Sequence, residues 1–157
     1  MNVTMKIATA LALSASIAGT ANAQGKIYGP PATDAYAMAP TSTATHNGSL
    51  MNVYELRGGR MEIRYADPRP GLTNIGVTPG TLLIKVVWVA PEKLEGTAYM
   101  FTSGCPALPY RVQGSIDRFG NILLSGPVPV TDYACNIVGY DWKSHNAYLR
   151  FDQVTER

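Results

Sequence analysis

From residue 46 onward the chain consists of short apolar segments separated by turn residues, and this pattern constrains the fold more than any other feature. Residues 61–65 (MEIRY) alternate apolar and polar side chains, which is the period of a half-buried strand. The Gly58-Gly59 pair before them suits the positive φ angles of a hairpin turn. No segment after residue 23 combines helix caps with apolar residues at helical spacing. The pattern predicts an all-β domain, a small antiparallel barrel or sandwich of about seven or eight strands.

Strands are expected wherever alternating or β-branched residues run between turn signals. Segments 67–71 (DPRPG) and 77–80 (VTPG) carry the prolines and glycines of turns. Gly96 predicts a bulge in its strand, and the proline-bearing segment 126–132 predicts irregular backbone. The expected strands are 49–56, 61–65, 81–89, 94–101, 110–115, 122–125 and 147–152, with weaker pairing at 133–138.

Residues 1–23 have the pattern of a signal peptide. Lys6 supplies a short positive region, residues 7–17 form an apolar run, and Ala21-Asn22-Ala23 is a small-x-small cleavage site. The run is too short to cross a bilayer, and no later segment approaches about 18 uncharged apolar residues. We therefore expect a soluble periplasmic or secreted product with no integral membrane segment after signal cleavage. An uncleaved signal acting as a membrane anchor is the alternative.

Residues 24–45 differ in composition from the rest of the chain. They are rich in Ala, Pro, Thr, Ser and Gly, and they show neither helical nor strand periodicity. We expect a flexible linker at 24–45 and a single all-β domain at 46–157. Docking of Tyr28, Tyr36 and Met38 onto the domain is the alternative.

The chain has two cysteines, Cys105 and Cys135. In an oxidising compartment two lone cysteines of a small domain most often pair, so we expect a structural disulfide. A redox-active pair is the alternative, but such pairs usually have C-x-x-C spacing. With both cysteines paired, the two histidines leave too few ligands for a zinc site, so no metal and no cofactor is expected.

The distribution of charge argues against nucleic acid as a partner. The formal net charge of the whole chain is +2, and its arginines and lysines are scattered singly among acids. Nucleic-acid binding normally requires a basic face or stripe. The same scatter argues against a polybasic membrane surface.

Catalytic patterns are weak. His46 and Ser49 are close in sequence, yet in an extended chain they would face opposite sides, and no G-x-S-x-G elbow is present. Asn47-Gly48 between them predicts a bend leading into the first strand. Acidic residues lie in expected turns or on outward strand faces, where carboxylates are usually solvated; these are Glu62, Asp67, Glu92, Glu95 and Asp117.

Two places are candidate binding sites. Asp67 and Arg69 flank Pro68 in a stiff loop, where they either pair with each other or present their charges to a partner. Tyr140 and Trp142 lie in an aromatic-rich segment with small polar neighbours, and such side chains offer rigid amphipathic contact area. The alternative is that these aromatic residues seal one end of the barrel.

A series of short motifs runs through the domain in a fixed order. The motifs are HNGS at 46–49, IRY at 63–65, PRPGL at 68–72, GVTPGTLL at 76–83, GTAY at 96–99, GCP at 104–106 and YRVQG at 110–114. They resemble those of a family of uncharacterised exported proteins and domains from rhizobial-type alphaproteobacteria, over most of residues 46–151. In that family the domain also occurs fused to caspase-like peptidase domains, which implies an accessory or binding role; no activity and no functional residue is carried over. Residues 84–88 (IKVVW) depart from the Phe-Gly-type continuation of the family.

Three functions are consistent with the sequence. The first is a non-enzymatic exported domain that binds a protein or a cell-envelope glycan. The second is an inhibitor of an extracellular hydrolase such as lysozyme, acting through the loop at 67–72. The third is a hydrolase that uses His46 or His145 with a nearby acid. A flat aromatic patch would favour the first, a protruding loop the second and a deep polar pocket the third.

Overall fold

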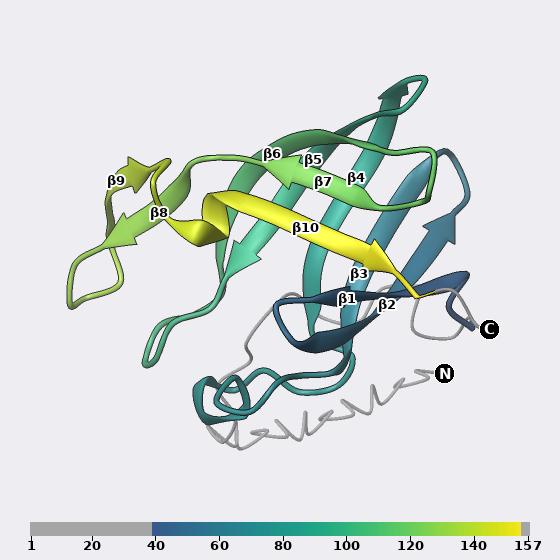
Figure 1. Ribbon diagram of the computed structural model, residues 1–157. Coiled ribbons are helices and arrows are strands. Elements are labelled where there is room, and N and C mark those ends of the chain that lie inside the picture. The colour runs from purple at the N-terminus through teal and green to yellow at the C-terminus, as the bar shows by residue number, and fades with distance from the viewer. Residues whose placement is uncertain (1–38, 155–157) are drawn as a thin grey trace, which may run out of the picture.

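The computed structural model describes residues 39–154, and they form a closed antiparallel β-barrel with an additional two-stranded arm (Figure 1). The expected all-β class is confirmed, in its barrel form. No helix in the described part of the chain is long and apolar enough to cross a membrane. The strands are β1 Ser42–His46, β2 Ser49–Leu56, β3 Arg60–Asp67, β4 Leu82–Ala90, β5 Lys93–Met100, β6 Leu108–Ile116, β7 Ile122–Ser125, β8 Val128–Thr131, β9 Ile137–Asp141 and β10 Tyr148–Gln153.

The barrel is an up-and-down meander of eight strands. Strands β1 to β6 each pair with the next one along the chain, and β10 pairs with both β7 and β1 to close the sheet. Strands β8 and β9 pair only with each other and form an arm between β7 and β10 (Figure 1). Closure removes the exposed edge strands that an open sheet of this size would have.

The expected C-terminal boundary of the linker, residue 45, is wrong, because strand β1 already begins at Ser42. Ala44 and His46 of this strand are buried in the barrel, while Thr45 between them is exposed. Its Ser/Thr-rich sequence has no strand signal of its own; pairing with β2 on one side and β10 on the other makes it a strand. The expected signal peptide, residues 24–38 of the linker and its three docking candidates Tyr28, Tyr36 and Met38 lie outside the described residues.

Strand β3 is more buried than its alternation predicts. Met61, Ile63 and Tyr65 lie in the core, but the polar residues between them are also buried. Arg64 is only 1 % exposed, and its guanidinium donates to the Glu62 carboxylate at 2.8 Å and to the Gly80 carbonyl at 2.8 Å. The expectation that Glu62 is a solvated outward acid is therefore wrong, because an ion pair makes its burial possible.

Gly96 marks a close approach of two strands rather than the expected bulge. It pairs in regular register with Val86 of β4 and Val112 of β6. A Cβ atom at this position would lie 2.2 Å from the Lys85 carbonyl oxygen, so only glycine fits. The absence of a side chain there lets the barrel wall curve tightly.

The two ends of the barrel differ. One end carries the tight turns β2–β3, β4–β5 and β6–β7. The other end carries the β1–β2 turn, the long β3–β4 and β5–β6 loops, and the β8–β9 arm. Binding and catalytic residues are found disproportionately on loops held by a rigid scaffold, so the loop end is where a site is expected.

Candidate functional site

The loop end contains a cavity of about 170 Å³ in the mouth of the barrel. Eight-stranded barrels have interiors that side chains fill or that hold one small ligand. Here apolar side chains come from the core and from the β3–β4 and β5–β6 loops. Polar side chains come from β1, β2, β3, β5, β6, the β1–β2 turn, the β3–β4 loop and the segment before β10. The lining residues are His46, Asn47, Ser49, Tyr65, Arg69, Leu72, Ile75, Leu83, Tyr99, Met100, Phe101, Tyr110, His145, Asn146 and Leu149.

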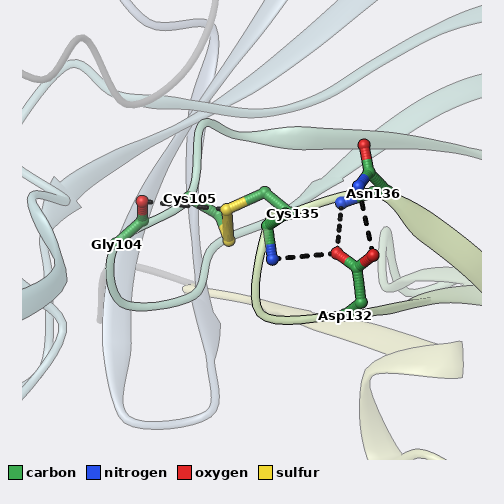
Figure 2. The surroundings of a disulfide bond; sticks show 6 residues. Gly104, Cys105, Asp132, Cys135 and Asn136 are labelled. Carbon is green, nitrogen blue, oxygen red and sulfur yellow. Dashed lines mark hydrogen bonds between the residues drawn. A yellow bond between two sulfur atoms is a disulfide. The ribbon is translucent and has the colours of Figure 1, made fainter.

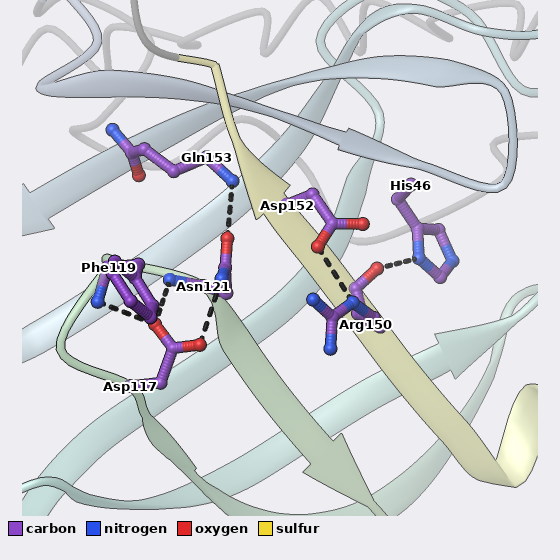
Figure 3. A network of polar contacts seen from close by, with 7 residues as sticks. All are labelled: His46, Asp117, Phe119, Asn121, Arg150, Asp152 and Gln153. Carbon is purple, nitrogen blue, oxygen red and sulfur yellow. Dashed lines mark hydrogen bonds and ion pairs between the residues drawn. The ribbon is translucent and has the colours of Figure 1, made fainter.

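His46 is the buried polar residue that joins the cavity to the barrel seam. Its Nδ1 atom lies 2.8 Å from the Arg150 carbonyl oxygen of β10 (Figure 3). Its ring stacks on Phe151 with 4.5 Å between centroids. A carbonyl only accepts, so Nδ1 carries the proton and donates it, which leaves Nε2 as an acceptor in the neutral ring. Burial lowers the pKa of His46 below its usual 6.5, against the raising effect of this hydrogen bond. The ring is therefore neutral at pH 7.

His46 and Ser49 face the same side of the sheet, contrary to the sequence-based expectation. Asn47 and Gly48 both have positive φ angles, of 47° and 79°, and form a two-residue hairpin turn. His46 is thus directly opposite Ser49 in the pairing of β1 with β2, and both side chains are buried. The bend at Asn47-Gly48 was expected, but the sequence did not indicate that it places His46 and Ser49 on the same side of the sheet.

Ser49 and His46 are nevertheless engaged with other partners. The Ser49 hydroxyl oxygen accepts a hydrogen bond of 2.9 Å from the Arg69 backbone N–H. Asn47 Nδ2 lies 3.3 Å from His46 Nε2. No hydrogen bond joins the imidazole to the serine hydroxyl within residues 39–154.

Two tyrosines from facing strands project into the cavity. Burial raises the pKa of Tyr65 to about 12, while nearby Arg69 works in the opposite direction. Burial also raises the pKa of Tyr110, whose hydroxyl donates to the Asn146 carbonyl at 2.8 Å. Both phenols therefore remain protonated at neutral pH and act as hydrogen-bond donors.

The structure separates the two charged residues expected to act together near Pro68. Arg69 lines the cavity, whereas Asp67 is an exposed residue at the end of β3 and is not part of the lining. No ion pair among the described residues joins them.

The loop that carries Arg69 packs against the barrel at the loop end. Pro68 is buried, and Leu72 and Ile75 pack against the core around the short helix η2, Thr73–Ile75. Figure 1 shows this loop beyond the ends of β3 and β4.

The β8–β9 arm presents the second candidate pair to solvent. Tyr140 is 61 % and Trp142 is 50 % exposed, so neither side chain seals the barrel. The arm also exposes aliphatic side chains at Val130, Ile137 and Val138. Trp142 connects through residues 143 and 144 to His145 and Asn146 of the cavity, so the arm and the cavity adjoin in sequence.

A disulfide fixes the tip of the arm to the β5–β6 loop, as expected (Figure 2). The Cα atoms of Cys105 and Cys135 are 5.5 Å apart. Asp132 braces the same turn by accepting from the backbone N–H groups of Ala134 and Asn136, at 2.9 Å each. The arm is thus held at its tip as well as at its base.

Sequence reasoning missed the buried members of the cavity. Tyr65 and Tyr110 were assigned to alternating strands, but the end of the barrel that each would reach was unknown. The available signal was the alternation of side chains along a strand. Tyr65 lies two residues after Ile63 and Tyr110 lies two residues before Val112, so each tyrosine shares the inward face of its strand with a core residue. Residues 39–154 contain no group of three or more histidine, cysteine or acidic side chains that could hold a metal ion.

Comparisons of the chain with protein-family models, with curated proteins and with solved structures find no match. The function must therefore be inferred from the site.

Proposed function

We propose that this chain is an exported, non-enzymatic binding domain that docks onto an envelope protein through its β8–β9 arm. The observation that carries the proposal is the set of apolar side chains exposed on a disulfide-tethered arm outside the barrel. Large apolar side chains gathered on a surface are typical of interaction sites. The exposed members are Val130, Tyr133, Ile137, Val138, Tyr140 and Trp142.

The composition of the arm favours a protein over a glycan. Sugar rings are bound mainly by aromatic faces, and Tyr140 and Trp142 would serve either partner. The aliphatic side chains of Ile137 and Val138, 42 % and 63 % exposed, gain free energy only by burial against apolar surface. Tyrosine and tryptophan are also the residues most enriched among those that dominate the energy of protein interfaces.

The constraints on the arm support the same function. A segment that is ordered before binding loses less conformational entropy in the complex. The disulfide at Cys135 and the carboxylate of Asp132 hold the tip, and pairing of β8 with β9 holds the rest. Disulfides persist in oxidising compartments, which agrees with export through the expected signal peptide.

The two alternative functions have less support. The loop at 67–72 lies against the barrel mouth, whereas an inhibitor of this kind needs a loop that enters the target enzyme. Both histidines line the cavity, which a hydrolase would require. However, Nε2 of His46 contacts the Asn47 amide, and Ser49 accepts from a backbone N–H, so this arrangement lacks a base paired with a nucleophile.

Site-specific photo-crosslinking in the producing cells tests the proposal. Tyr140→p-benzoylphenylalanine places the crosslinker on the arm. Trp88→p-benzoylphenylalanine is the matched control, because Trp88 is also a surface aromatic residue, 39 % exposed, but precedes the β4–β5 turn at the opposite end of the barrel. We expect a discrete, protease-sensitive adduct from the arm position alone.

A second variant tests whether the arm supplies the binding energy. Trp142→Ala, combined with the crosslinker at position 140, should reduce the adduct about tenfold or more if Trp142 dominates the interface. A protease-resistant adduct that sediments with peptidoglycan would identify a glycan partner and contradict the proposal. Equal adducts from the arm and control positions, or none from the arm, would also contradict it.

A further inference from the structure

We propose that the cavity in the barrel mouth binds a small organic carboxylate, with the carboxylate at Arg69 and the apolar part of the ligand against the core. This site is separate from the protein-docking arm and does not depend on it. Four properties of the cavity carry the inference: its size, its charge, a tyrosine hydroxyl that is accessible from the cavity, and its division into polar and apolar parts.

The size sets the class of ligand. The cavity measures about 170 Å³. An engineered protein cavity of about 150 Å³ binds benzene, so this one accommodates a body of that size. A sugar chain or a peptide segment is too large to enter it.

The charge of the lining selects an anion. Arg69 is exposed at the rim and belongs to none of the ion pairs among the described residues. No aspartate or glutamate is among the residues that line the cavity. A cationic ligand would therefore meet a guanidinium without a compensating acid, whereas a carboxylate matches the planar fork of arginine donors.

A tyrosine hydroxyl supplies a second donor. Tyr65 as a whole is only 5 % exposed and lines the cavity, and its hydroxyl has no hydrogen-bond partner among residues 39–154. No buried side-chain oxygen or nitrogen of these residues lacks a partner, so the hydroxyl is accessible from the cavity, where water or a ligand accepts its hydrogen. Tyr110 is already committed to the Asn146 carbonyl, so Tyr65 is the phenol available to a ligand oxygen.

The cavity is amphipathic. Its exposed lining residues are polar, at Asn47, Arg69 and His145, while Leu83 and Leu149 in its lining are buried members of the core cluster. A ligand with a charged head and an apolar body fits this division better than an inorganic anion does, because burial of its apolar part adds to the affinity.

Titration calorimetry of the full chain with benzoate, benzamide and acetate as probes tests the site. Benzoate should bind saturably at one site. Benzamide has the same shape without the charge, and acetate has the charge without the ring, so each should bind at least tenfold more weakly. Absence of benzoate binding, equal binding of benzamide, or equal binding of acetate overturns the proposal.

Variants locate the binding. Arg69→Gln should weaken benzoate at least tenfold and leave benzamide unchanged, and Tyr65→Phe should weaken benzoate several-fold. Arg111→Gln is the matched control, because Arg111 is an exposed arginine of the barrel wall that pairs with Glu95. An unchanged benzoate affinity in Arg69→Gln, with native near-ultraviolet circular dichroism, overturns the assignment even if benzoate binds elsewhere.

Discussion

At the scale of single residues, His46 links stability to the candidate site. Its imidazole donates to the backbone of β10 where β1 and β10 close the barrel, stacks on Phe151, and lines the cavity. Protonation would keep the hydrogen bond to β10, but it would leave a buried imidazolium beside the Arg69 guanidinium with no acidic partner, which is unfavourable. The protonation state of one side chain therefore affects the closure of the whole sheet.

The lowered pKa of His46 predicts that the fold loses stability on mild acidification. Between the folded-state pKa and the unfolded value near 6.5, the unfolded chain binds the proton and the folded chain does not. The free energy of unfolding should therefore be fully present above about pH 6.5 and fall as the pH decreases, by at most about 1.4 kcal/mol per pH unit for this group. Urea unfolding at pH 7.5 and pH 5.5 measures the fall.

The variant His46→Gln isolates the contribution of this imidazole. Glutamine has an N–H donor but does not titrate, so the fall in unfolding free energy between the two pH values should be smaller than in the native protein. The same fall in both proteins would show that other groups cause the pH dependence.

At the scale of elements, the chain uses one turn design twice. Asp117–Asn121 and Asp132–Asn136 share the pattern D-x-x-x-N. In each, the aspartate accepts from the backbone N–H groups two and four residues later and from the side chain of the asparagine. The fourth residue has positive φ in both, 84° at Gly120 and 66° at Cys135. In the second turn a cysteine adopts this conformation, and both its disulfide and the hydrogen bonds to Asp132 constrain the backbone of the turn.

Removing the disulfide should release the arm before it affects the barrel. The double variant Cys105→Ser/Cys135→Ser leaves the second turn with a non-glycine residue at positive φ and no crosslink. The free energy of unfolding should fall by about 3–4 kcal/mol, the chain-entropy estimate for a loop of this length. Hydrogen exchange in β8 and β9 should accelerate through local opening of the arm, whereas the amides that pair β4 with β5 should accelerate only as far as the fall in the global free energy of unfolding requires. Unchanged exchange in the arm would show that the turn holds it without the crosslink.

Sequence reasoning recovered the elements whose own residues specify them. The β2–β3 hairpin, β4, β5, β6, β7 and β10 all lie within a few residues of the expected positions. Strand β1 was missed because its partners, far away in sequence, make it a strand. The region of β8 was expected as irregular backbone because Pro129 suppresses the strand signal, yet a short ribbon with free edges tolerates proline. Weak pairing was expected at 133–138, whereas its partner strand β9 lies at Ile137–Asp141.

At the scale of the whole molecule, stability depends on closure by the last strand. β10 supplies Leu149 and Phe151 to the core and covers the edges of β1 and β7. Deleting residues 148–157 would leave both edges unpaired and the core open on one side, which is the condition for edge-to-edge association. We expect aggregated or expanded protein by size-exclusion chromatography.

The control for this deletion is Tyr148→Ala in the same strand. Tyr148 is 63 % exposed, so its truncation removes little buried area and the variant should elute as the native protein does. A deletion variant that elutes as a compact monomer would show that β10 is dispensable.

The candidate site was less predictable than the fold. Arg69, Tyr140 and Trp142 were identified from loop chemistry, and the structure places all three at the loop end or on the arm that extends from it. The grouping of His46, Tyr65 and Tyr110 required the register of three different strands, which one sequence does not specify. A cavity arises from barrel closure as a whole and has no local signature.

The described chain enters the barrel at Ser42 and leaves it after Gln153, and the pairing of Ala44 with Gln153 puts both places at the tight-turn end. The arm and the cavity lie at the opposite end. An affinity tag, a fusion partner or a surface-coupling group attached beyond either end of this unit would therefore be joined on the side away from the proposed contacts. Immobilisation through a terminus should orient the domain with its loops toward the analyte, so both proposed binding surfaces would stay accessible on a sensor surface.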